Sequence, residues 1–122
     1  MKTTIIVDTD VITEYLKTGK GSLPGAYEKF SMVISAATLL ELLASKTFVD
    51  ESLGQEVKEF VDKYFVIKEI DRKVAEKAAE IIRESEVTMA TALVAATALV
   101  FSHKVLTNNP GEYNGIDGVE FA

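Results

Sequence analysis

Residues 3–17 read TTIIVDTDVITEYLK, and this stretch indicates the fold class. Residues 3–7 are β-branched and mostly apolar, which predicts a buried strand that ends at Asp8. Apolar side chains then recur at helical spacing from Val11 to Leu16, which predicts a helix that ends near Gly19. The chain therefore begins with a strand, an acidic residue at its carboxyl end, and a helix, which together form the first unit of an α/β fold.

The same alternation of strand and helix continues along the chain. Further strands are predicted over residues 32–35, 64–70, 104–106 and 119–121. Further helices are predicted over residues 24–30, 36–45, 51–63 and 88–101, with another that starts at Asp71. Such alternation implies a central parallel sheet of four to five strands flanked by helices, built as a single α/β domain over residues 1–122.

Composition and charge restrict the chemistry. The net charge of −6 argues against a sequence-specific DNA-binding module, because Lys and Arg dominate nucleic-acid affinity. It does not exclude an enzyme that acts on RNA, since carboxylates gathered around Mg²⁺ are themselves negative. The chain has no cysteine, so oxygen atoms or the lone His103 would have to hold any metal. His103 follows a predicted helix, where a solvated or dipole-favoured histidine is expected rather than a catalytic one.

Two features of the sequence bear on location. Asp8 would fall inside the apolar core of a signal peptide, and the longest apolar run, Ala90 to Phe101, is too short to span a bilayer. We therefore expect a soluble, cytoplasmic protein with no membrane contact.

Several acidic or amide side chains follow the predicted strands. In open parallel sheets, ligands bind beyond the carboxyl ends of the strands. Asp8 and Asp10 follow the first strand, Glu41 stands alone in the apolar helix after the second, and Asn109 and Glu112 follow the fourth. Oxygen ligands of this kind suit a hard cation such as Mg²⁺ or Mn²⁺. The simpler interpretation is that Asp8 caps the next helix and Asn109 lies in a turn.

Five segments, taken in order, carry a family resemblance. They are IIVDTDVI (residues 5–12), ISAATLLEL (34–42), ALVAATAL (92–99), VLTNNPGEY (105–113) and GVEF (118–121). This order resembles a PIN domain, in particular the toxin of a VapBC-type toxin–antitoxin pair, over essentially the whole chain. The resemblance implies a ribonuclease that depends on Mg²⁺ or Mn²⁺, is usually a homodimer, and is blocked by a cognate antitoxin protein.

The resemblance also implies roles for individual residues. Asp8 matches the family's first catalytic acid, Glu41 the second, and Asn109 the fourth position, so these three are the predicted catalytic residues. Asp10 falls where the family usually has Ser or Asn. Glu112 matches an Asp that the family often has in the segment after the fourth strand, which also holds Asn109. Asp8, Glu41, Asp10, Asn109 and Glu112 are therefore the predicted metal ligands.

One family position is substituted. Thr91 stands where the third acid normally opens the Ala-rich helix, and a hydroxyl supplies a neutral oxygen in place of an anionic one. The main expectation is a metal-dependent endoribonuclease that this substitution impairs. The alternatives are a catalytically inactive PIN-like module that keeps its partner-binding surface, and an unrelated α/β regulatory domain whose acids are helix caps.

The first half of the chain carries more large apolar residues than a small core needs. These residues are Tyr15, Leu16, Phe30, Leu43 and Phe48. Surplus apolar surface predicts a homodimer or a helical partner peptide.

Overall fold

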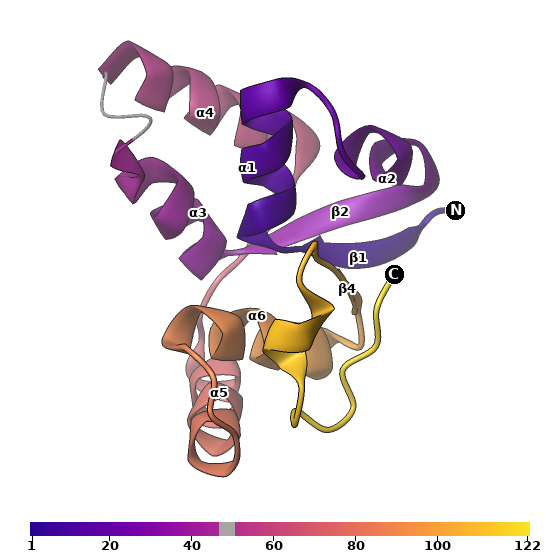
Figure 1. Cartoon of the computed structure of the whole chain (residues 1–122), viewed down its shortest axis with the longest axis vertical. Coiled ribbons are helices and arrows are strands. Elements are labelled where there is room, and N and C mark those ends of the chain that lie inside the picture. The colour runs from indigo at the N-terminus through magenta and orange to yellow at the C-terminus, as the bar shows by residue number, and fades with distance from the viewer. Residues whose placement is uncertain (47–50) are drawn as a thin grey trace.

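The computed structural model describes residues 1–46 and 51–122, apart from the side chain of Glu51. Figure 1 shows the arrangement of its helices and strands. In chain order these are β1 (Thr3–Val7), α1 (Thr9–Thr18), α2 (Leu23–Lys29), β2 (Phe30–Ser35), α3 (Ala36–Ala44), α4 (Glu51–Tyr64), β3 (Val66–Lys68), α5 (Arg72–Glu84), α6 (Met89–Phe101), β4 (Lys104–Leu106) and the 3-10 helix η2 (Pro110–Tyr113). The predicted alternation of strands and helices is confirmed.

The four described strands form one parallel sheet in the order β3-β2-β1-β4. The central pair is in register from Thr3 opposite Phe30 to Ile6 opposite Val33. Because every strand runs the same way, the carboxyl ends of β1, β2 and β4 meet at one edge. The loops that leave this edge lead into α1, α3 and η2.

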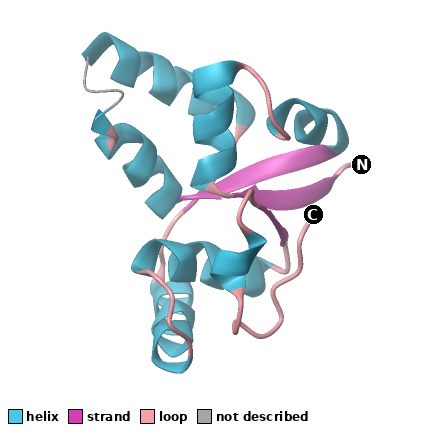
Figure 2. Ribbon diagram, viewed as in Figure 1, coloured by secondary structure: helices cyan, strands magenta, loops and turns pink. Residues whose placement is uncertain are grey.

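Successive strand residues face opposite layers of helices. Ile5 and Val7 of β1 belong to a core shared with α1 to α4, whereas Ile6 belongs to a second core with α5 and α6. Figure 2 shows these two layers, with α1, α3 and α4 on one side of the sheet and α5 and α6 on the other. A sheet buried on both faces explains why its strands read as continuous apolar runs.

The helices start at polar caps that the sequence supplies. The side chains of Asp8, Ser35, Asp71 and Thr88 each accept a hydrogen bond from a backbone N–H in the first turn of the following helix. Helix α1 ends at Gly19, whose φ of 70° is left-handed and therefore favours glycine. Two of these caps, Asp8 and Thr88, lie at the same edge of the sheet as the predicted site.

Two predicted strands are shorter in the structure. Residues 64–70 supply only the three residues of β3, because Tyr64 still belongs to α4 and the chain leaves the sheet after Lys68. Residues 119–121 supply a single parallel bridge, from Phe121 to Val105, instead of a fifth strand. No helix among residues 1–46 and 51–122 has the length and apolar character needed to cross a membrane.

Candidate functional site

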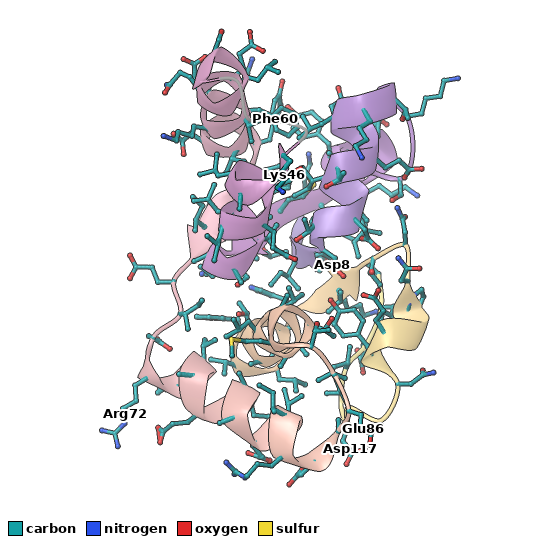
Figure 3. All side chains as sticks on the ribbon, turned by 60° about the vertical axis from the view of Figure 1, so that its left-hand side comes forward. Asp8, Lys46, Phe60, Arg72, Glu86 and Asp117 are labelled. Carbon is teal, nitrogen blue, oxygen red and sulfur yellow. The ribbon has the colours of Figure 1, made fainter. Side chains whose placement is uncertain are left out.

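A pocket of about 450 Å³ lies at the carboxyl edge of the sheet. Its lining comes from the start of α1, from α3, from the start of α6 and from the η2 segment. The lining residues are Asp8, Thr9, Asp10, Thr13, Glu41, Thr88, Ala90, Thr91, Asn109 and Glu112. The structure thus brings all five predicted ligands, and Thr91, to one pocket, although the sequence spreads them over more than a hundred positions. Figure 3 shows Asp8 between the two layers of helices.

Asp8 is buried, with 9% of its surface exposed, and its carboxylate is hydrogen-bonded on both oxygens. The Oδ1 atom accepts from the backbone N–H of Thr9 over 2.8 Å, which makes Asp8 the N-cap of α1. The Oδ2 atom accepts from the Thr107 hydroxyl over 3.0 Å and from the Tyr113 hydroxyl over 2.8 Å. Its backbone N–H donates to the carbonyl of Leu106, which ties Asp8 to β4.

Glu41 joins the site through Thr9. The Thr9 hydroxyl donates to Oε1 of Glu41 over 2.7 Å and lies 3.1 Å from the hydroxyl of Thr38, one helical turn before Glu41. Thr38 is fully buried, whereas Glu41 is exposed. Thr9 therefore contacts both predicted catalytic carboxylates, one through its backbone and the other through its side chain.

Asp10 holds the loop after β4. Its carboxylate accepts from the backbone N–H of Asn108 over 3.2 Å, from the Asn109 side-chain amide over 2.8 Å and from the Thr107 hydroxyl over 3.3 Å. The side chain of Asn108 donates in turn to Glu14, one turn further along α1. This network fixes the position of Asn109 against the start of α1.

Glu112 is exposed on the rim of the pocket. Partial burial raises the pKa of its carboxyl, and the negative charges of Asp8, Asp10 and Glu41 raise it further. Glu112 therefore adds a fourth carboxylate to the pocket that Asp8, Asp10 and Glu41 line.

Thr91 faces the pocket at the start of α6 and is 8% exposed. Its backbone N–H donates to the Thr88 hydroxyl oxygen over 3.2 Å, and the two hydroxyl oxygens lie 3.1 Å apart. The third position of the site is therefore a neutral hydroxyl pair that belongs to the helix cap.

The charge and the donor types of the pocket bear on whether a cation fits it. None of the described side chains that line it is Lys or Arg, so no lining cation balances the four carboxylates. Among the described residues, no three His, Asp or Glu side chains lie close enough together to hold a metal ion. Mg²⁺ commonly keeps several waters and uses only one or two carboxylates. The donors thus fit a partly hydrated hard cation bound by two carboxylates, and they do not form an all-protein cage.

Three residues of the site were missed in the sequence analysis. Thr9, Thr107 and Tyr113 organise the carboxylates, yet each is an ordinary residue in its local pattern. The Asp8 contacts of Thr107 and Tyr113 span 99 and 105 positions, so local periodicity carries no sign of them.

The family is shown by comparison with known proteins. The PIN domain family matches residues 5–114, which is most of the chain. The chain belongs to the PIN domain family, and this excludes the unrelated regulatory domain considered from the sequence. No curated protein matches the sequence.

Solved structures of toxin–antitoxin complexes share the fold. A chain of DNA-bound VapBC from Salmonella typhimurium is 24% identical with a TM-score of 0.83, covering 100% of this chain and 98% of that one. A chain of VapBC2 from Rickettsia felis, bound to a promoter DNA fragment, is 19% identical with a TM-score of 0.81, covering 98% and 97%. A chain of a toxin–antitoxin complex from Klebsiella pneumoniae is 22% identical with a TM-score of 0.76, covering 94% of each.

Proposed function

We propose that this protein is a toxin-type endoribonuclease that depends on Mg²⁺ or Mn²⁺, with Asp8 and Glu41 as its principal metal ligands. The observation that carries the proposal is the double contact of Thr9, whose N–H binds Asp8 and whose hydroxyl binds Glu41. It draws carboxylates from two separate elements into one pocket without a lining Lys or Arg to balance them. The family match supports the same reading.

Some residues of the site are proposed to bind the metal, and others to fix the position of the surrounding loop. Oε1 of Glu41 is engaged by Thr9, which leaves Oε2 for a cation or for the proton of an attacking water. Asp10 and Asn109 bind each other, so their role is to fix the loop and to complete the rim. Glu112 lines the same pocket and adds negative charge that attracts a cation to Asp8 and Glu41. A divalent cation bound here would supply Lewis-acid charge to a phosphodiester and lower the pKa of water.

The test is cleavage of a single-stranded RNA by the purified protein in Mn²⁺ and in EDTA. Cleavage should require the metal, and Asp8→Asn should abolish it because Asp8 is a proposed ligand. Glu86→Gln is a matched control, since Glu86 lies at the far end of the domain from Asp8 in Figure 3. Equal cleavage by Asp8→Asn and the unchanged protein would refute the assignment.

A second function is favoured by the neutral cap at the third position. Thr91 and Thr88 bind each other there, and the pocket gains no anion from α6. On this reading the chain is an inactive PIN-like binding module. The alternative predicts that no divalent metal produces cleavage, while binding of a partner protein is retained.

The proposed partner is an antitoxin, as in the complexes that share the fold. A second pocket, of about 280 Å³, lies between α1, α2 and α4 and has aromatic walls. Its walls include Tyr15, Tyr27, Phe60 and Tyr64, and Tyr27 is 51% exposed. Such a concave aromatic surface suits an apolar segment of a partner protein. Co-expression with the small protein encoded beside its gene should give a complex that Tyr27→Glu weakens; an unweakened complex would place the partner elsewhere.

The proposed homodimer requires apolar surface other than that expected from the sequence. Tyr15, Leu16, Phe30 and Leu43 are half-buried and pack on the core, and Phe48 lies outside the described residues. Leu40 of α3 and Met89 of α6 are large apolar residues at 68% and 70% exposure, and each is next in sequence to a residue that lines the carboxylate pocket. Light scattering of the unchanged protein and of Leu40→Lys tests whether Leu40 lies in a contact between two copies. A cytoplasmic location, predicted from the sequence, stays a prediction.

A further inference from the structure

Tyr113 is a buried tyrosine whose hydroxyl contacts a predicted catalytic carboxylate. It is 3% exposed, and its ring packs edge-on against Phe121 with 5.9 Å between ring centroids. Burial raises the pKa of its hydroxyl, and the charge of Asp8 and the hydrogen bond to it raise the pKa further. A tyrosine hydroxyl is protonated at neutral pH, and this one donates to Oδ2 of Asp8 over 2.8 Å.

The two carboxylate oxygens of Asp8 differ in how many of their acceptor sites are occupied. A carboxylate offers about four lone-pair sites, two on each oxygen. Tyr113 and Thr107 occupy those of Oδ2, whereas the Thr9 N–H occupies one of those on Oδ1. Oδ1 is thus the oxygen of Asp8 that keeps an open site.

Tyr113 contacts the carboxylate of Asp8 from outside the pocket. It belongs to η2 and is not among the described residues that line the pocket. Thr107 divides its single hydroxyl proton between Asp8 and Asp10, so it is the weaker of the two donors to Oδ2. The Tyr113 hydroxyl, in contrast, donates its proton to Oδ2 of Asp8 alone.

We propose that Tyr113 is a positioning residue that saturates Oδ2 of Asp8 and leaves Oδ1 as the single oxygen with which Asp8 binds a divalent cation. The proposal rests on the proposed function, because it assumes that Asp8 is a metal ligand. It goes further by assigning which oxygen binds and which residue selects it. Groups that orient a metal ligand by hydrogen bonding commonly change metal affinity ten- to hundred-fold when they are removed.

The test compares Tyr113→Phe with the unchanged protein, because this change removes the hydroxyl and keeps the buried ring. Mg²⁺ affinity is measured by calorimetry, and folding is checked by circular dichroism. Affinity should fall by about tenfold. Ser85→Ala removes a hydroxyl that donates to the carbonyl of Gly115 and does not line the carboxylate pocket, so it should leave Mg²⁺ affinity unchanged.

Tyrosine absorbance provides a second readout that needs no folded variant. The chain has four tyrosines and no tryptophan, so a change in one tyrosine environment is visible. Mg²⁺ binding at Asp8 withdraws charge from the acceptor of the Tyr113 hydroxyl, so the unchanged protein should give a tyrosine difference spectrum on titration. Ser85→Ala should retain this spectrum, and Tyr113→Phe should lose it.

The possible results distinguish failure of the positioning role of Tyr113 from failure of metal binding by Asp8. If the unchanged protein binds Mg²⁺ through Asp8, as Asp8→Asn shows by losing it, but gives no difference spectrum, the positioning role is refuted alone. Unaltered affinity in a folded Tyr113→Phe would refute it in the same way. If Asp8→Asn binds Mg²⁺ as well as the unchanged protein does, both proposals fail.

Discussion

The hydroxyl of Thr9 donates to Oε1 of Glu41 over 2.7 Å, although 32 residues separate the two in sequence. The backbone N–H of Thr9 simultaneously donates to Oδ1 of Asp8, the N-cap of α1, so one small residue sets the relative position of two carboxylates. The separation arises because Thr9 opens the helix after β1, whereas Glu41 lies in the helix after the neighbouring parallel strand β2. Two adjacent parallel strands therefore deliver the two halves of the site.

Thr9→Val should weaken Mn²⁺ binding by about tenfold, because it removes the donor to Glu41 and keeps the backbone bond to Asp8. The change also removes the contact with the buried Thr38 hydroxyl, so stability should fall by about 1–3 kcal/mol. Calorimetric titration with Mn²⁺ measures the first effect and urea unfolding the second. Thr13→Val is the matched control, since Thr13 lines the same pocket but its hydroxyl bonds neither carboxylate. Equal Mn²⁺ affinity for both variants would contradict the role of Thr9.

Thr91→Asp should have opposite effects on stability with and without metal. In EDTA the new carboxylate is a largely buried charge beside four other carboxylates. Because no metal balances it, stability should fall by a few kcal/mol. In millimolar Mn²⁺ the added anionic ligand should restore stability, tighten metal binding by about tenfold, or 1.4 kcal/mol, and raise RNA cleavage. Thermal melting in both buffers measures the difference.

Thr91→Asn is the control for this change, because it loses the same hydroxyl without adding charge. It should be destabilised to a similar degree in EDTA and Mn²⁺. Equal destabilisation of Thr91→Asp in both buffers, with no gain in cleavage, would show that position 91 does not serve a metal.

Glu112→Gln should stabilise the metal-free protein and diminish the stabilisation that Mn²⁺ provides. The pKa of Glu112 is raised above its ordinary value of 4.5. The folded protein therefore holds this proton more tightly than the unfolded chain does, and the free energy of unfolding falls as pH rises above about 4.5. Removing the charge relieves this repulsion and also removes negative charge that attracts the cation to the pocket. Melting temperatures in EDTA and in Mn²⁺ at neutral pH check both parts. The same change at the distant Glu86 should alter neither, and a metal-free Glu112→Gln protein less stable than the starting chain would be a failed prediction.

The order of the elements could be predicted because buried parallel strands and amphipathic helices have distinct periodicities. The possible fifth strand at residues 119–121 is reduced to a single parallel bridge at Phe121, while Val119 packs on the core. The acids could be found from their places after strands. Their hydrogen-bond donors could not, because Thr9, Thr107 and Tyr113 acquire partners only when distant elements meet.

His103→Gln should reduce the loss of stability on mild acidification. Burial, assisted by the positive charge of Lys68, lowers the pKa of His103 below its ordinary value of 6.5, contrary to the dipole-favoured state considered from the sequence. Below pH 6.5 the unfolded chain takes up a proton that the folded protein refuses, so stability is lost as pH falls through this window. Urea unfolding between pH 5.5 and about 7.5 measures the slope for both proteins. Identical slopes would mean that His103 titrates normally in the folded state.

A crystal soaked in Mn²⁺ and measured for anomalous scattering tests directly whether Asp8 and Glu41 share a divalent cation. We predict a peak in the pocket at the carboxyl edge of the sheet, with one oxygen of Asp8 and one of Glu41 at about 2.1 Å and water at the remaining positions. Coordination through Oδ1 of Asp8 would agree with the arrangement set by Tyr113. A crystal that shows no peak between Asp8 and Glu41, although the soaking concentration of Mn²⁺ raises the melting temperature in solution, would show that these two carboxylates do not hold the metal.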